Sequence, residues 1–115
     1  MKAVVLFQPG NSGALKYTDF PDPSGLAPGE VIVRVKACGV NHLDIWIRNG
    51  TTAYGTVYPH IPGSDISGVV ESCAPDAGLF PPGTPVIISP QLGCFQCQAC
   101  LSGFDNRCRQ FKIIG

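Results

Sequence analysis

Four closely spaced cysteines near the end of the chain constrain its fold more than any other feature. Cys94, Cys97, Cys100 and Cys108 form the array C-x2-C-x2-C-x7-C. Thiolates two residues apart on a turning backbone can converge on one ion, and four of them complete a tetrahedral shell around Zn²⁺ that leaves no position for water or substrate. The array therefore predicts one structural zinc ion, whose binding would supply much of the folding free energy of this segment.

Two other uses of clustered cysteines remain open. The chain has six cysteines, an even number that a secreted disulfide framework would also give. The apolar run at residues 3–7 is broken by Gln8 and Pro9 and is too short for a signal peptide. We therefore expect a cytoplasmic, reducing location, where metal binding is the better use of thiols. An iron–sulfur cluster matches less well, because the bacterial ferredoxin run closes with Cys-Pro after three residues, whereas seven residues precede Cys108.

Length and composition exclude several classes of protein. A chain of 115 residues forms at most one domain. Eight basic and eight acidic residues give zero net charge without a basic run, so nucleic acid and anionic membranes are not expected partners. No apolar stretch is long enough to span a bilayer. The 14 glycines and 11 prolines favour short strands joined by many turns over a helical bundle.

Apolar periodicity predicts a mainly β chain. In the clearest strand, Val31, Val33, Val35 and Ala37 alternate with the residues of the opposite face, as in a half-buried sheet. Cys38 and Cys73 fall in apolar strands, where a free cysteine is usually buried. The expected strands cover residues 2–7, 14–18, 30–38, 66–73 and 86–89. These strands and wide loops predict a small, partly open β-barrel.

One short helix is predicted between two of these strands. Asn41 is placed to cap it, and Gly50 supplies the C-terminal stop. Leu43, Trp46 and Ile47 fall at positions i, i+3 and i+4, which form one apolar stripe. The same pattern leaves open whether Trp46 packs into the core.

The order of these pieces resembles the N-terminal GroES-like domain of the medium-chain dehydrogenase/reductase superfamily, the zinc-type alcohol dehydrogenases and quinone reductases. The match covers essentially the whole chain. The resemblance implies a GroES-like domain over residues 1–115, incomplete at its C-terminus, with a structural zinc lobe at residues 93–109. The motifs that carry it are Pro28-Gly29-Glu30-Val31, Gly39-Val40-Asn41-His42-Leu43-Asp44, Pro62-Gly63-Ser64-Asp65 with Gly68-Val69-Val70, and the four-cysteine lobe.

The family's metal-site positions can be matched to this sequence residue by residue, and the match implies fewer metal ions than in zinc-catalysed members. Zinc-catalysed members show Gly-Val-Cys followed two residues later by Ser or Thr, then Gly-His-Glu. That Cys and His bind the catalytic metal, and the hydroxyl passes a proton. Here these positions hold Asn41, Leu43 and Ser64, and an amide or hydroxyl is a poor zinc ligand. The resemblance thus implies structural zinc without catalytic zinc, and it leaves open whether the substrate is an alcohol, carbonyl, enone or quinone.

Three residues of the predicted helix region are our candidates for lining the catalytic cleft. The resemblance implies Asn41 as a polar orienting group, Trp46 as an apolar wall, and Asp44 beside them. His42, Asp44, His60 and Asp65 are also chemically capable of binding a second metal ion. However, His42 and Asp44 are two residues apart on a helix and point to different faces. Asp44 is better explained as an acceptor for nearby backbone N–H groups or for Arg48.

The chain contains no strand followed by G-x-G-x-x-G and a helix. In the family, the NAD(P)-binding Rossmann domain follows the present end, as does a further strand of the barrel. The resemblance therefore implies part of an oxidoreductase that is inactive alone and forms a homo-oligomer as the whole enzyme. A missing strand would leave an open edge prone to pairing with another chain. The alternative is a free-standing zinc-stabilised β-barrel used for assembly, since fold does not determine function.

Overall fold

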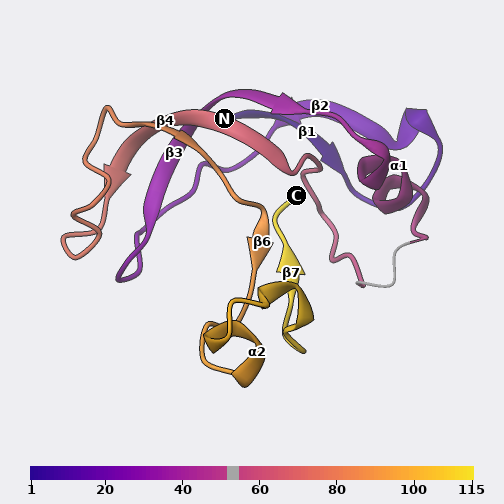
Figure 1. The fold of residues 1–115 in the computed structure, drawn as a ribbon. Helices are drawn as coiled ribbons and strands as arrows, with labels where there is room; N and C mark the ends of the chain where they lie inside the picture. The colour runs from indigo at the N-terminus through magenta and orange to yellow at the C-terminus, as the bar shows by residue number, and fades with distance from the viewer. Residues whose placement is uncertain (52–54) are drawn as a thin grey trace.

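The strands of this chain form a thin β layer from which the cysteine segment projects (Figure 1). The computed structural model describes residues 1–51 and 55–115. Within these residues the strands form three antiparallel sheets, ordered β1-β2, β3-β4-β5 and β6-β7, and no closed barrel. The strands are β1 (Lys2–Leu6), β2 (Leu15–Asp19), β3 (Val31–Gly39), β4 (Asp65–Cys73), β5 (Pro85–Ile87), β6 (Gln91–Leu92) and β7 (Lys112–Ile113). The predicted mainly β, partly open architecture is confirmed.

The five predicted strands are present, with ends that differ by one or two residues. The helices are α1 (His42–Asn49), α2 (Gln98–Leu101) and two 3₁₀ turns, Ser12–Ala14 and Asp105–Arg107. The sequence predicted α1 but neither α2 nor the 3₁₀ turns, which are too short to show a periodic pattern. Among the described residues, no helix has the length and apolar character needed to cross a membrane.

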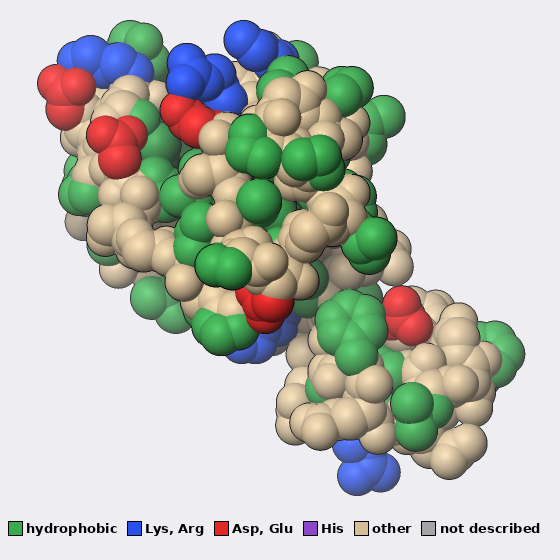
Figure 2. All heavy atoms as spheres, turned by 90° about the vertical axis from the view of Figure 1, so that its left-hand side faces the viewer, with side chains coloured by type: hydrophobic (Ala, Val, Ile, Leu, Met, Phe, Trp, Pro, Cys, Tyr) green, Lys and Arg blue, Asp and Glu red, His purple; other side chains and the backbone are tan. Residues whose placement is uncertain are grey.

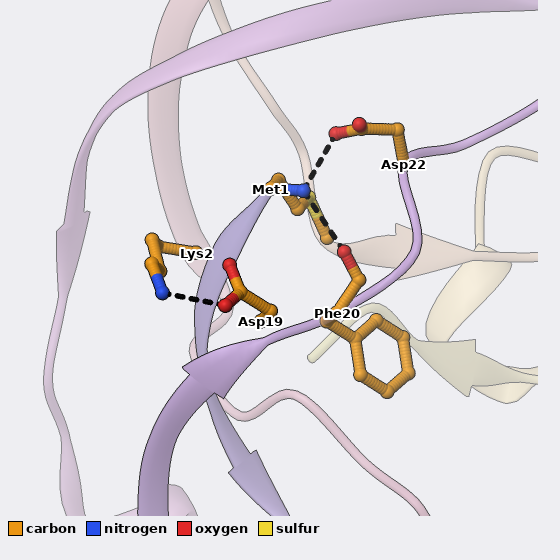
Figure 3. Close-up of polar contacts among 5 residues, drawn as sticks. All are labelled: Met1, Lys2, Asp19, Phe20 and Asp22. Carbon is orange, nitrogen blue, oxygen red and sulfur yellow. Dashed lines mark hydrogen bonds and ion pairs between the residues drawn. The ribbon is translucent and has the colours of Figure 1, made fainter.

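The β1-β2 hairpin carries the most deeply buried side chains. Val5 and Leu6 are fully buried, and Leu6 exchanges two backbone hydrogen bonds of 2.8 Å with His60, which ties the later loop to β1. At the open end of the hairpin, the Met1 amine donates to the Phe20 carbonyl at 2.9 Å and pairs with Asp22 at 3.0 Å (Figure 3). Lys2 pairs with Asp19 at 2.7 Å across the same strands (Figure 3). These pairs are exposed and contribute little to stability.

Strand β4 is the central strand of the larger sheet, and it pairs with β3 from Val31↔Cys73 to Gly39↔Asp65. The register shifts twice, between Ile32 and Val33 and between Val35 and Ala37. The expected alternation of buried and exposed residues is absent from β3, whose first three residues are half-buried. Every residue from 34 to 39 is exposed, including Cys38, so the prediction of a buried Cys38 is wrong.

Helix α1 begins and ends where the sequence predicts. The Asn41 side chain accepts a hydrogen bond from the Leu43 N–H at 3.2 Å, and Asp44 Oδ2 accepts one from the Asn41 N–H at 2.8 Å. Together they form a capping box. Gly50 ends the helix at φ 72°, a conformation that glycine adopts without strain. Ile47 is buried, whereas Trp46 is 51% exposed, so Trp46 does not belong to the core.

The cysteine segment is held by the two-residue strands β6 and β7. They pair as Gln91↔Ile113 and Leu92↔Lys112, and the Ile114 N–H donates to the Pro90 carbonyl at 2.9 Å. Between them the chain forms α2 and the second 3₁₀ turn, which contact each other. We call residues 93–109 the cysteine lobe; Figure 2 shows it as a separate knob below the β layer.

Candidate functional site

The four cysteines of the array converge in the folded chain. Their sulfur atoms all lie within 4.8 Å of one another, and no other group of three or more His, Cys, Asp or Glu ligands occurs in residues 1–51 and 55–115. The Cys97 and Cys100 sulfurs are 3.5 Å apart, and those of Cys94 and Cys100 are 4.0 Å apart. Tetrahedral zinc with Zn–S bonds of about 2.3 Å places its sulfurs about 3.8 Å apart. Donor type, number and spacing therefore fit zinc.

Backbone N–H groups favour the thiolate form at Cys94, whereas burial raises the pKa of Cys100 to about 12 in the absence of a metal ion. Phe95 has φ 57°, a left-handed conformation that is uncommon for a non-glycine residue. After this turn, the backbone N–H groups of Gln96 and Cys97 donate to the Cys94 sulfur and lower its pKa to about 6. The Cys108 sulfur accepts from the Cys94 N–H at 3.4 Å and from the Gln110 N–H at 3.3 Å. Such N–H donors stabilise negative charge on sulfur.

Two arginines place positive charge beside the cluster. Arg107 and Arg109 line the same surface hollow as Cys94, Cys97 and Cys108, and the Arg107 guanidinium also lies 5.0 Å from the centre of the Phe104 ring. Four thiolates around one Zn²⁺ leave a net charge of minus two. These cations are therefore placed to offset part of that charge.

The three predicted cleft residues lie on or next to α1, but their side chains do not converge. Both ends of the Asn41 amide are engaged: its oxygen caps the helix, and its Nδ2 donates to Asp65 Oδ2 at 3.1 Å. Asp44 accepts from the Asn41 backbone, whereas Arg48 donates to Asn49 instead of Asp44. Trp46 packs edge-on against His42, with ring centres 5.0 Å apart.

Asn41 and Ser64, the positions at which the family resemblance implies metal ligands, carry polar side chains that are poor ligands for zinc. The Asn41 amide nitrogen is a donor already bonded to Asp65, and the Ser64 hydroxyl is a weak ligand on a side chain that is 3% exposed. His42, Asp44, His60 and Asp65, the ligands considered for a second metal, form no group of three converging donors among the described residues.

A cavity beside α1 was not predicted from the sequence. It has a volume of about 440 Å³ and is lined by residues from the start of α1, the loop before β4, and β7. Leu43, Val57, Phe111 and Ile113 form apolar walls, and His60 lines one side. Burial lowers the pKa of His60, which favours the neutral imidazole. The only signal in the sequence was a histidine in a proline-rich loop, which does not reveal a cavity.

Comparisons with known proteins place this geometry in a family. The profile of the alcohol dehydrogenase GroES-like domain matches residues 27–115. A crystal structure of an NAD-dependent alcohol dehydrogenase superposes with a TM-score of 0.94 at 43% identity, over 100% of this chain and 33% of that one. The cobalt- and zinc-bound thermostable alcohol dehydrogenase from Pyrobaculum aerophilum gives 0.85 at 37% identity, over 96% of this chain and 32% of its own.

The relatives also include an enzyme of the quinone reductase type. Quinone oxidoreductase from Homo sapiens is 36% identical over 92 residues, which cover 77% of this chain and 27% of that protein. The chain thus spans about a quarter to a third of the length of the proteins it matches. Because the family profile covers more than half of the chain, and the fold and cysteine array agree with it, the chain belongs to the alcohol dehydrogenase GroES-like domain family.

Proposed function

We propose that residues 1–115 form the substrate-side, N-terminal GroES-like domain of an NAD(P)-dependent oxidoreductase, with a structural zinc lobe at residues 93–109. The match to the family profile over residues 27–115 supports this assignment. So does the identity of the relatives, an NAD-dependent alcohol dehydrogenase and a quinone oxidoreductase among them. The observation that carries the proposal is the convergence of four cysteine sulfurs in a chain of this family.

The cysteine lobe would hold one zinc ion per chain through Cys94, Cys97, Cys100 and Cys108. A four-thiolate shell is closed, so this ion would stabilise the lobe and take no part in catalysis. It would bring together the two ends of a segment that carries few apolar contacts of its own: Cys108 is the one buried hydrophobic residue between residues 93 and 115. The ion would thereby also fix the spacing of β6 and β7.

The α1 side of the domain would face the substrate without a catalytic metal. Asn41 would orient a polar group of the substrate near the N-terminus of α1. Asp44 would support Asn41 through the helix cap, and the exposed Trp46 would offer an apolar surface. The nicotinamide, which donates or accepts hydride, would come from a nucleotide-binding domain outside residues 1–115. The substrate would be a small alcohol, carbonyl, enone or quinone; the relatives include an alcohol dehydrogenase and a quinone oxidoreductase.

Cofactor titration of the 115-residue chain tests whether the nicotinamide cofactor binds outside residues 1–115. We expect no saturable binding of NADH or NADPH by fluorescence or calorimetry, because the chain has no glycine fingerprint for pyrophosphate. As a positive control, the chain can replace the matching segment of the NAD-dependent alcohol dehydrogenase on which it superposes, and this chimera should bind NADH. Micromolar binding to the chain alone would contradict the proposal.

A further inference from the structure

The cavity beside α1 and the cysteine lobe are joined by one element, the short strand β7. Phe111, Lys112 and Ile113 line the cavity, and they follow closely after Cys108, the last cysteine of the array. The other lining residues come from the start of α1 and from the loop before β4, His60 among them. The shape of the cavity therefore depends on what holds β7 in place.

Strand β7 has few supports of its own. Within residues 1–51 and 55–115 it pairs only with β6, and each of the two strands has two residues. An isolated two-stranded sheet is marginally stable at best, and no residue after Cys108 is fully buried. The chain before β6, by contrast, is anchored to the main sheet, because the Ile88 N–H donates to the Ile66 carbonyl at 2.9 Å. We therefore looked for the contacts that hold the two ends of β7.

On the lobe side, β7 is tied to one of the four cysteines. The Cys108 sulfur accepts the Gln110 N–H at 3.3 Å, and the Cys108 carbonyl accepts the Phe111 N–H at 3.1 Å. The same sulfur accepts the Cys94 N–H at 3.4 Å, from the first cysteine of the lobe. A metal ion that draws the four sulfurs together fixes the position of Cys108. The bonds to Gln110 and Phe111 carry that constraint to the first residue of the cavity wall.

At its other end, β7 meets the loop that carries His60. The Ile114 N–H donates to the Pro90 carbonyl at 2.9 Å, and a Cβ on Gly115 would collide with the Gly63 carbonyl. The His60 ring bonds the Gly115 backbone, and because this bond raises the pKa of the imidazole, the ring is the donor. Nε2 is buried without a partner among the described residues, so the donated proton is on Nδ1.

We propose that zinc in the cysteine lobe completes the cavity beside α1, because it holds β7 against the loop that carries His60. The path runs from Cys108 along β7 to Gly115 and His60, through hydrogen bonds and close backbone contacts. This role rests on the proposed function, which includes the zinc ion but confines its effect to the lobe and to β6 and β7. The ion stays outside catalysis, yet its occupancy decides whether one wall of the cavity forms.

Removal of zinc tests this link, with the two histidines of the chain as reporters. In long-range ¹H–¹⁵N spectra at neutral pH, His60 of the zinc-loaded chain should show a single Nδ1–H tautomer. His42, which is exposed on α1, serves as the reference. Chelation of zinc under reducing conditions should convert His60 to an exchanging mixture of tautomers and leave the His42 signals unchanged. An unchanged His60 after complete loss of zinc would overturn the proposal.

Amide exchange in β1 separates a local effect from general unfolding. Leu6 and His60 share two backbone hydrogen bonds of 2.8 Å, which hold the backbone of the loop without help from β7. We expect removal of zinc to speed hydrogen exchange at the Ile114 amide by at least about tenfold and to leave the Leu6 amide unchanged. Equal loss of protection at both amides would show that zinc holds the whole domain, and would also overturn the proposal.

Gly115→Ala breaks the path at its far end without changing a cysteine. The new Cβ would collide with the Gly63 carbonyl, and φ 92° strains a residue other than glycine. This variant should keep the zinc content of the unmodified chain, yet its His60 should show a mixture of tautomers. Gly25→Ala is the matched control, because Gly25 has φ 78° but a Cβ there meets no described atom within 4 Å. A single Nδ1–H tautomer in zinc-loaded Gly115→Ala would contradict the path.

Elemental analysis of every sample keeps two failures apart. A chain that binds no zinc contradicts the proposed function, and the role of zinc in the cavity with it. A chain that binds zinc, but whose His60 tautomer and Ile114 exchange are the same with and without the metal, contradicts only that role. Cys108→Ser should reproduce the His60 spectrum of the zinc-depleted chain, whereas Cys73→Ser should reproduce that of the zinc-loaded chain.

Discussion

Replacement of Cys108 by serine is expected to release the zinc ion and unfold the cysteine lobe. Cys108 is the most buried ligand of the four and receives two backbone hydrogen bonds. Structural zinc sites of this size contribute on the order of 10 kcal/mol of folding free energy, and a hydroxyl cannot replace the thiolate. Elemental analysis after dialysis should give well under one equivalent of zinc per chain. In amide NMR spectra, the chemical shifts of residues 93–109 should move to the values of an unfolded chain.

Cys73→Ser is the matched control for this experiment. Cys73 lies at the end of β4, is partly buried, and is not among the converging sulfurs. Its replacement should leave the zinc content and the lobe spectrum unchanged. Loss of zinc from Cys73→Ser, or full zinc retention by Cys108→Ser, would show that a different set of thiols holds the ion.

Replacement of Gly68 by alanine should strongly destabilise the central sheet. A Cβ at Gly68 would lie 2.5 Å from the Arg34 carbonyl oxygen and 2.7 Å from Val33 Cγ1. The first contact is with backbone in the paired strand β3, which cannot move aside without breaking the ladder. We expect a loss of about 3 kcal/mol in the free energy of unfolding, at the upper end for overpacking. Urea denaturation of the zinc-loaded protein measures it.

Gly78→Ala provides the comparison. A Cβ at Gly78 meets nothing within 4 Å, and the residue does not have a positive φ. Alanine there restricts the unfolded chain and should stabilise the protein by up to about 1 kcal/mol. Equal unfolding midpoints for the two variants would mean that β3 and β4 approach each other less closely than described.

The features that could be predicted from the sequence are those that local chemistry determines. Asn41 and Gly50 define the ends of α1 through a side-chain cap and a left-handed turn, and both effects act within a few residues. Of the five longer strands, β1, β3, β4 and β5 contain two or more β-branched residues between turns, whereas β2 contains only Thr18. The cysteine array was informative for the same reason, because ligand spacing limits how thiols can converge.

The features that could not be predicted depend on contacts between distant segments. Strands β6 and β7 have two residues each, too few for a pattern, and they exist because the lobe brings its ends together. The register shifts in β3 arise from its pairing with β4. The exposure of both faces of β3 from residue 34 to residue 39, Cys38 included, depends on which other segments cover the sheet. Trp46 has the spacing of a core residue, yet Ile47 takes the buried position next to it.

The residues of the candidate site also fall into those that local sequence predicts and those that it does not. The four sulfurs that sequence spacing linked do converge. Of the three residues grouped by family resemblance, Asn41 and Asp44 are joined through the helix cap, whereas Trp46 contacts His42 instead. The roles of Asn41, Asp44 and Trp46 in a catalytic cleft stay predictions.

The metal content of the purified chain tests the central claim most directly. Elemental analysis after extensive dialysis, with protein measured independently, should give close to one equivalent of zinc and no iron. One equivalent would agree with a structural ion in the cysteine lobe and with an α1 region that does not bind metal. Two equivalents would contradict an α1 region that does not bind metal. A folded chain without zinc would contradict a structural ion in the cysteine lobe.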